Sequence, residues 1–71
     1  MKLDLRQLRH VLAVDRYRNF ARAADAVGIT QPALSRSLQA LEEAVGGRLF
    51  ARDRVRVAPT ALGLRLIALA R

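Results

Sequence analysis

A group of polar side chains in the middle of the chain has the spacing of one helix face. On one side of that helix lie Pro32, Ser35, Arg36 and Gln39, and just before them come Thr30 and Gln31, the latter four residues before Ser35. Glutamine can pair with adenine, arginine with guanine or phosphate, and serine with either, while a proline ring offers an apolar surface to a thymine methyl group. The first carboxylates, Glu42 and Glu43, come only at the far end of this segment. The pattern favours contact with duplex DNA, and it is also typical of an ordinary solvated helix face.

Three arginines recur at every second position farther along the chain, at Arg52, Arg54 and Arg56. Residues 53–54 are a turn candidate, so the three arginines would lie at and on both sides of the turn of a projecting two-stranded ribbon. In a ribbon beside a DNA-reading helix, such residues meet the adjacent backbone or the minor groove. The alternative is that these charges lie on an exposed ribbon edge and discourage aggregation.

The charge balance of the whole chain is strongly basic. Within 71 residues, 13 Lys and Arg face 6 Asp and Glu, which gives a net charge of +7. Every cation except Lys2 is arginine, the residue that grips phosphate in a bidentate fork. The balance indicates a polyanionic partner, although a GC-rich genome also encodes an excess of arginine.

Residues suited to catalysis or metal binding are scarce. The chain has no cysteine, and His10 is its only histidine, so thiolate and zinc sites are not expected. Glu42 and Glu43 are adjacent and therefore do not face each other on a helix. We expect neither an enzyme nor a cofactor.

No stretch of the chain has the features of a targeting or membrane-spanning segment. The first nine residues lack an apolar run. The longest apolar-rich stretch, residues 61–70, is too short to cross a bilayer. We expect a cytoplasmic protein without a membrane partner.

Helix start signals place the polar group on the third of three helices. Asp4 and Asn19 are candidate N-caps of the first two, and Thr30 is the candidate N-cap of the third. The first helix should end around residues 16–18, and the third at residues 46–47, where two glycines follow each other. An apolar stripe with helical spacing lies opposite the polar group, at Leu34, Leu38, Leu41 and Val45.

The link between the second and third helices is only four residues long, from Val27 to Thr30, and contains Gly28. So short a link makes the two helices cross steeply, as in a helix-turn-helix. Ala23 and Ala24 supply the small side chains that close crossing needs.

After the third helix the sequence predicts two short strands and a last helix. The expected strands are residues 48–52 and 55–57, Pro59 is expected to end the second strand, and Thr60 should cap the helix. That helix is apolar nearly all round, at Leu62, Leu64, Leu66, Ile67 and Leu69. Such a helix needs cover on more than one side, so we expect a second copy to pack on it. The alternative is a frayed, adhesive chain end.

Five blocks of residues occur in a characteristic order: Phe20-Ala21-Arg22-Ala23-Ala24, Ile29-Thr30-Gln31-Pro32-Ala33-Leu34-Ser35-Arg36, Leu41-Glu42, Arg48-Leu49-Phe50-Ala51-Arg52 and Pro59-Thr60-Ala61-Leu62-Gly63. In order and separation they closely resemble the N-terminal domain of LysR-type transcriptional regulators, and the resemblance covers nearly the whole chain. It implies a mainly helical, winged helix-turn-helix domain over residues 1–59. Residues 60–71 would then begin the linker helix that pairs two copies as a homodimer.

The resemblance also implies roles for individual residues. Gln31, Pro32, Ser35 and Arg36 would contact promoter DNA in the major groove, and the wing arginines would contact the backbone or minor groove. The wing departs from the family pattern, because it has no glycine at its tip and carries Val55 where a basic residue is common. Arg54 or Arg56 would serve instead. The family's effector ligand binds a larger C-terminal domain that these 71 residues do not contain.

Two other functions fit the composition. One is a protein-interaction module whose basic face meets an acidic partner. The other is a membrane-surface peptide that uses the last helix, although that helix lacks the tryptophan or lysine-rich flanks typical of such peptides.

Overall fold

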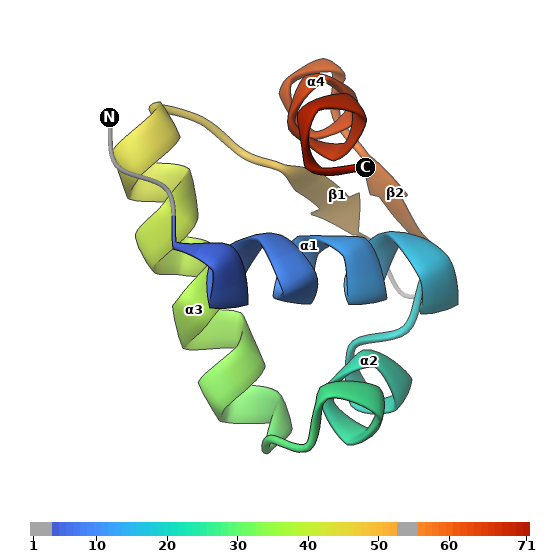
Figure 1. The fold of residues 1–71 in the computed structure, drawn as a ribbon. Coiled ribbons are helices and arrows are strands. Elements are labelled where there is room, and N and C mark those ends of the chain that lie inside the picture. The colour runs from blue at the N-terminus through green and yellow to red at the C-terminus, as the bar shows by residue number, and fades with distance from the viewer. Residues whose placement is uncertain (1–3, 53–55) are drawn as a thin grey trace.

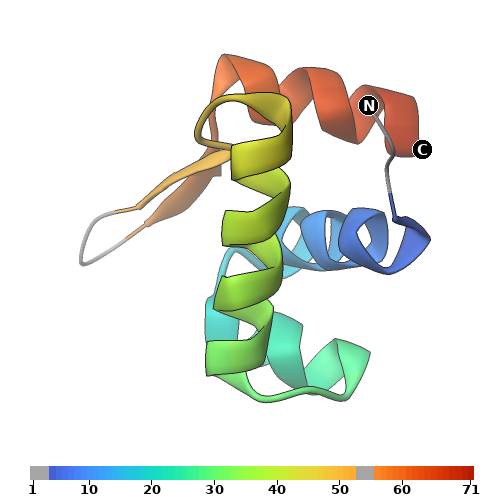
Figure 2. The same cartoon turned by 90° about the vertical axis from the view of Figure 1, so that its left-hand side faces the viewer.

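The computed structural model describes residues 4–52 and 56–71 (Figure 1). Its elements follow in the order α1 (Leu5–Tyr17), α2 (Phe20–Val27), α3 (Gln31–Val45), β1 (Phe50–Arg52), β2 (Val57–Pro59) and α4 (Ala61–Ala70). Helix α3 runs across α1 and α2, α4 lies on the other side of α1 from α2, and the two-stranded ribbon projects beside α3 (Figure 2). This is the mainly helical, winged helix-turn-helix arrangement that the sequence predicts.

Each helix begins at a residue whose side chain accepts a hydrogen bond from a backbone N–H two or three residues farther on. The donor–acceptor distances are 2.8 Å at Asp4, 2.9 Å at Asn19, 3.3 Å at Thr30 and 3.1 Å at Thr60. Such caps satisfy backbone donors that no helix carbonyl can reach. The four predicted helix starts are therefore confirmed.

The helix ends make the connections short. Gly28 and Gly46 follow α2 and α3 with φ of 77° and 84°, a left-handed conformation that glycine adopts at little cost. Beyond Gly28, the Ile29 N–H donates to the Ala24 carbonyl at 3.0 Å, which closes the end of α2. The chain therefore turns directly from α2 into Thr30 and α3.

The core lies where α1, α2 and α3 meet and continues beneath β1 and α4. Its largest fully buried side chains are Leu34, Leu41, Leu49, Val11 and Val14. Ala23 and Ala24 are also buried, between helices that approach closely. The predicted apolar stripe of α3 is confirmed at Leu34, Leu38 and Leu41, and Val45 packs at its edge. The opposite face of α3 is thereby left to solvent.

The strands differ from those predicted. Strand β1 begins at Phe50 rather than at Arg48, because the backbone groups of Arg48 and Leu49 are hydrogen-bonded to Glu42 and Thr60 instead. Strand β2 comprises residues 57–59 rather than 55–57. It ends at Pro59 as predicted, but Pro59 is itself part of the strand and pairs with Phe50. A proline is tolerated there since each strand of a two-stranded ribbon is an edge strand. Residues 53–55, with the predicted contact Arg54, lie outside the described part of the chain.

Helix α4 is divided between a buried and an exposed side. Leu66 and Ile67 are 5% and 4% exposed and belong to the core. Leu64 and Leu69 are 56% and 80% exposed. The described domain therefore covers one side of this apolar helix and leaves the other uncovered.

Candidate nucleic-acid interface

The side chains predicted to read DNA lie on the outer side of α3. Thr30, Gln31, Pro32, Arg36 and Gln39 are exposed, and Ser35 is half-buried. Pro32, Ser35, Arg36 and Gln39 lie opposite the buried leucines of the same helix, and Thr30 and Gln31 lie at its N-terminal end. The positive end of the α3 dipole lies at the same end as Thr30 and Gln31, which favours a nearby phosphate. One continuous surface therefore carries hydrogen-bonding groups and no carboxylate over the first two turns of α3.

Arg36 lies in the middle of this surface. In the described part of the chain it has no acidic partner, since no ion pair there includes it. The carboxylates of Asp4, Asp15 and Glu42 are paired with other arginines. The Arg36 guanidinium therefore keeps its donors for an external acceptor.

A cavity of about 260 Å³ separates α3 from the wing. Ser35 and Gln39 line it from α3, and Arg52 lines it from β1. These three predicted contacts thus meet at one concave site, whereas Thr30, Gln31, Pro32 and Arg36 lie outside it on the exposed helix face. The predicted residues of α3 and β1 therefore lie on two adjacent parts of the surface.

Basic residues of the wing also line a hollow on the ribbon itself. Arg56 is exposed just before β2 and lines a shallow hollow together with Arg52. The structure thus brings Arg52 and Arg56 to the same side of the ribbon. The position of Arg54 is outside the described residues.

Phe20 also lines the cavity between α3 and the wing, although its sequence position marks it only as a helix start. The Arg52 guanidinium lies 4.5 Å from the centroid of the Phe20 ring, a distance at which a cation and an aromatic face attract each other. Phe20 therefore holds Arg52 against the body of the domain at the mouth of the cavity. An aromatic residue directly after the N-cap Asn19 is the signal that the sequence offers for this role.

Arg48 is the second residue of this site that the sequence pattern does not reveal. It lines the cavity between α3 and the wing, and its Nε lies 3.7 Å from Glu42 Oε2. The sequence predicts that Arg48 is the first residue of a strand. That assignment does not tell whether its side chain points toward α3 or away from it.

His10 connects α1 to the back of α3. Its Nδ1 lies 2.7 Å from Ser37 Oγ. Burial, followed by the positive charges of Arg6 and Arg9, lowers the pKa of His10, so the neutral imidazole is favoured. The contact holds α3 from the side opposite its exposed face.

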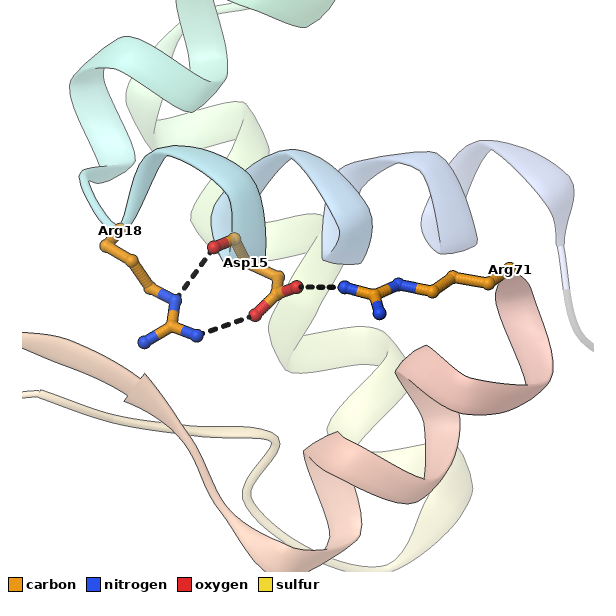
Figure 3. A network of polar contacts seen from close by, with 3 residues as sticks. All are labelled: Asp15, Arg18 and Arg71. Atoms are coloured by element: carbon orange, nitrogen blue, oxygen red, sulfur yellow. Dashed lines mark hydrogen bonds and ion pairs between the residues drawn. The ribbon is translucent and has the colours of Figure 1, made fainter.

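Asp15 connects three parts of the fold, as Figure 3 shows. It accepts from Arg18 through its backbone carbonyl at 2.7 Å and its carboxylate at 3.0 Å, and from Arg71 at 3.3 Å. Arg18 is the one described non-glycine residue with a positive φ, 51°. Asp15 therefore supports the left-handed residue through which α1 passes into α2.

Other kinds of site are not found in the described residues. They contain no group of three or more His, Cys, Asp or Glu side chains that could hold a metal ion. Among these same residues, no helix is both long and apolar enough to cross a membrane.

Three packed helices, a short helix-turn-helix link and a basic two-stranded ribbon define a winged helix-turn-helix domain. Residues 5–64 match the model of the bacterial regulatory helix-turn-helix proteins of the lysR family. The chain belongs to this family, whose relatives are transcriptional regulators rather than enzymes.

Individual relatives resemble the chain over most of its length. The HTH-type transcriptional regulator IlvR of Caulobacter vibrioides is 56% identical over 61 residues, which cover 86% of this chain and 21% of the relative. The SDS degradation transcriptional activation protein of a Pseudomonas species is 53% identical over 68 residues, covering 96% and 22%. The chain thus spans about a fifth of the length of these curated relatives.

Solved structures of DNA complexes have the same fold. The BenM DNA-binding domain in complex with benA site 1 DNA is 40% identical, with a TM-score of 0.89, covering 96% of this chain and 76% of that one. The CbnR DNA-binding domain in complex with DNA is 35% identical, with a TM-score of 0.91, covering 97% and 79%.

Proposed function

We propose that this domain binds double-stranded promoter DNA sequence-specifically, with α3 in the major groove and the wing on the adjacent backbone or minor groove. The observation that carries the proposal is the exposed, carboxylate-free face of α3 at Gln31, Pro32 and Arg36, next to an arginine-bearing wing. The net charge of +7 supports it. So does the likeness to domains whose structures were solved as DNA complexes.

The side chains have different roles in this proposal. Gln31 and Arg36 have the donors and acceptors to read base edges, and Pro32 offers an apolar contact to a thymine methyl group. Ser35 and Gln39 line the cavity beside the wing and contact the base edges or the nearest DNA strand. Thr30 lies at the positive end of α3, where it favours a phosphate. The wing arginines Arg52, Arg54 and Arg56 contact the backbone or the minor groove.

We further propose that the chain pairs with a second copy through α4. The exposed Leu64 and Leu69 supply an apolar side that a partner helix would cover. Two domains held in this way would bind an inverted repeat. Sedimentation equilibrium tests the pairing, and a monomer at high concentration would refute it for these 71 residues.

The cellular setting follows from the same proposal. A bacterial promoter-binding protein acts in the cytoplasm, where the DNA is. An effector ligand would be bound in the remainder of a full-length regulator, since this chain corresponds to about a fifth of its relatives.

Titration of duplex DNA by fluorescence anisotropy at increasing salt tests the DNA-binding proposal. DNA binding predicts that the logarithm of the affinity falls linearly with the logarithm of the salt concentration. An interaction module for an acidic protein predicts no binding to DNA at moderate salt. Selection of bound duplexes from a random pool would then give the preferred sequence, and an inverted-repeat consensus would support both the base reading and the dimer.

A further inference from the structure

The connection between α3 and the wing is held by a carboxylate of α3 itself. The backbone N–H of Leu49 donates to Glu42 Oε2 at 2.8 Å, and the Arg48 Nε lies 3.7 Å from the same oxygen. The Leu49 side chain is fully buried. Glu42 therefore fixes the chain one residue before β1 begins.

The same two residues are held from the other side by the start of α4. Thr60 Oγ1 donates to the Arg48 carbonyl at 2.5 Å, and the Thr60 N–H donates to the Leu49 carbonyl at 3.0 Å. A Cβ atom at Gly63 would overlap the Leu49 carbonyl oxygen. The first turn of α4 therefore lies directly against the Leu49 backbone, so α3, β1 and α4 meet at one junction.

A negative charge at this place needs an explanation, because Glu42 lines the cavity that faces the proposed DNA site. A carboxylate repels phosphate, so a solvated surface position would favour a neutral or basic residue here. The Arg48 guanidinium offsets the negative charge of the Glu42 carboxylate, and the Leu49 N–H donates a hydrogen bond to its Oε2. The contacts of the Glu42 carboxylate with Leu49 and Arg48 therefore account for its presence here, and contact with DNA does not.

We propose that Glu42 is a positioning residue for DNA binding, which aligns the wing with α3 by holding the Leu49 backbone at the start of β1. This inference rests on the proposed DNA-binding function. Arg52 follows Leu49 by three residues and lies across the cavity from Ser35 and Gln39. Release of Leu49 would let the wing turn about its base and would separate Arg52 from the α3 face.

Three variants separate this role from a general effect of charge. Glu42→Ala removes both the acceptor and the charge, whereas Glu42→Gln keeps an acceptor oxygen for the Leu49 N–H. Glu43→Ala is the matched control, because Glu43 is the adjacent, exposed carboxylate of the same helix. Each is titrated with the duplex selected by the wild-type domain, over a range of salt concentrations.

We expect Glu42→Ala to weaken binding about tenfold and to reduce the salt slope by about one for each phosphate that the wing no longer neutralises. Glu42→Gln should stay within about twofold of the wild type with an unchanged slope, since a neutral acceptor still holds the backbone. Glu43→Ala should leave the slope unchanged. The penalty for a mismatched base under α3 should be the same in all of them, because the reading face does not move.

A double-mutant cycle tests the connection to the wing directly. Arg52→Ala should weaken binding less in the Glu42→Ala background than in the wild type, whereas Arg36→Ala should weaken it equally in both. If Glu42→Ala does not fold, Glu42→Asp replaces it, because a carboxylate one methylene shorter does not reach the Leu49 N–H.

A folded Glu42→Ala domain with wild-type affinity and slope would overturn the inference. An equal loss in Glu42→Gln would also overturn it, because charge rather than backbone positioning would then be responsible. Absence of DNA binding by the wild type would instead refute the proposed function, so the two failures are distinguishable.

Discussion

Replacement of Gly63 by alanine tests the packing of α4 with a change of a single methyl group. In a helix interior, alanine is favoured over glycine by about 1 kcal/mol, so an uncrowded site would be stabilised. At Gly63 the added Cβ would overlap the Leu49 carbonyl oxygen, and a backbone atom cannot rotate away. We therefore expect the opposite sign, since α4 must move off Leu49 and weaken the hydrogen bonds of Thr60.

The size of the effect follows from those contacts. Overpacking costs about 1–3 kcal/mol, and each weakened hydrogen bond about 1 kcal/mol. After the gain in helix propensity, the free energy of unfolding should fall by about 2–4 kcal/mol. For a domain of this size, that lowers Tm by about 10–30 °C in thermal unfolding followed by circular dichroism.

Gly47→Ala provides the matched control for this measurement. The Cβ at Gly47 would meet Leu62 Cδ2 at 3.0 Å, the end of a flexible side chain that can give way. Its Tm should change much less than that of Gly63→Ala. A Tm for Gly63→Ala equal to or above that of the wild type would refute the close approach of α4 to Leu49.

Three further results are expected. Arg36→Ala should cost about 1–3 kcal/mol of binding free energy on the preferred duplex and much less on random DNA; equal losses in the two titrations would make Arg36 a phosphate contact. Arg56→Ala should weaken binding to both duplexes alike and flatten the salt slope by about one, and an unchanged slope would remove Arg56 from the interface. The pKa of His10 is lowered from 6.5, so the unfolded state takes up its proton first as pH falls. The free energy of unfolding should therefore decrease as pH drops through 6.5 and below. When Tm is measured over the same pH range, the His10→Gln variant should lack this decrease.

Much of the helical fold could be predicted from the sequence because its signals are local. Asn19 and Thr30 mark helix starts, and Gly28 marks an end, through hydrogen bonds within a few residues. The apolar spacing of α3 predicts its buried side and thus its exposed face. The helix-turn-helix and the polar face of the candidate site follow from these signals.

The wing could not be placed as well, because its register depends on contacts that are distant in sequence. Glu42 and Thr60 engage the backbone of Arg48 and Leu49 and delay the start of β1. The pairing of Pro59 with Phe50 follows from that position. Likewise, the stacking of Arg52 on Phe20 joins residues that sequence spacing cannot bring together. The parts of the site that sequence patterns do not reveal are therefore those that depend on tertiary contacts.

Besides the buried contacts of Leu66 and Ile67, α4 is held by polar contacts at its two ends, and these differ in strength. At its far end, Arg71 meets Asp15 at 3.3 Å with a side chain that is 71% exposed. Such an exposed ion pair contributes about 0–1 kcal/mol and is weakened further by salt. At its near end, two hydrogen bonds and the close approach of Gly63 hold α4 against Leu49. The start of the proposed dimer helix is therefore held at the junction where the wing also begins, so a displacement of that start would act on the wing before it reached the reading face of α3.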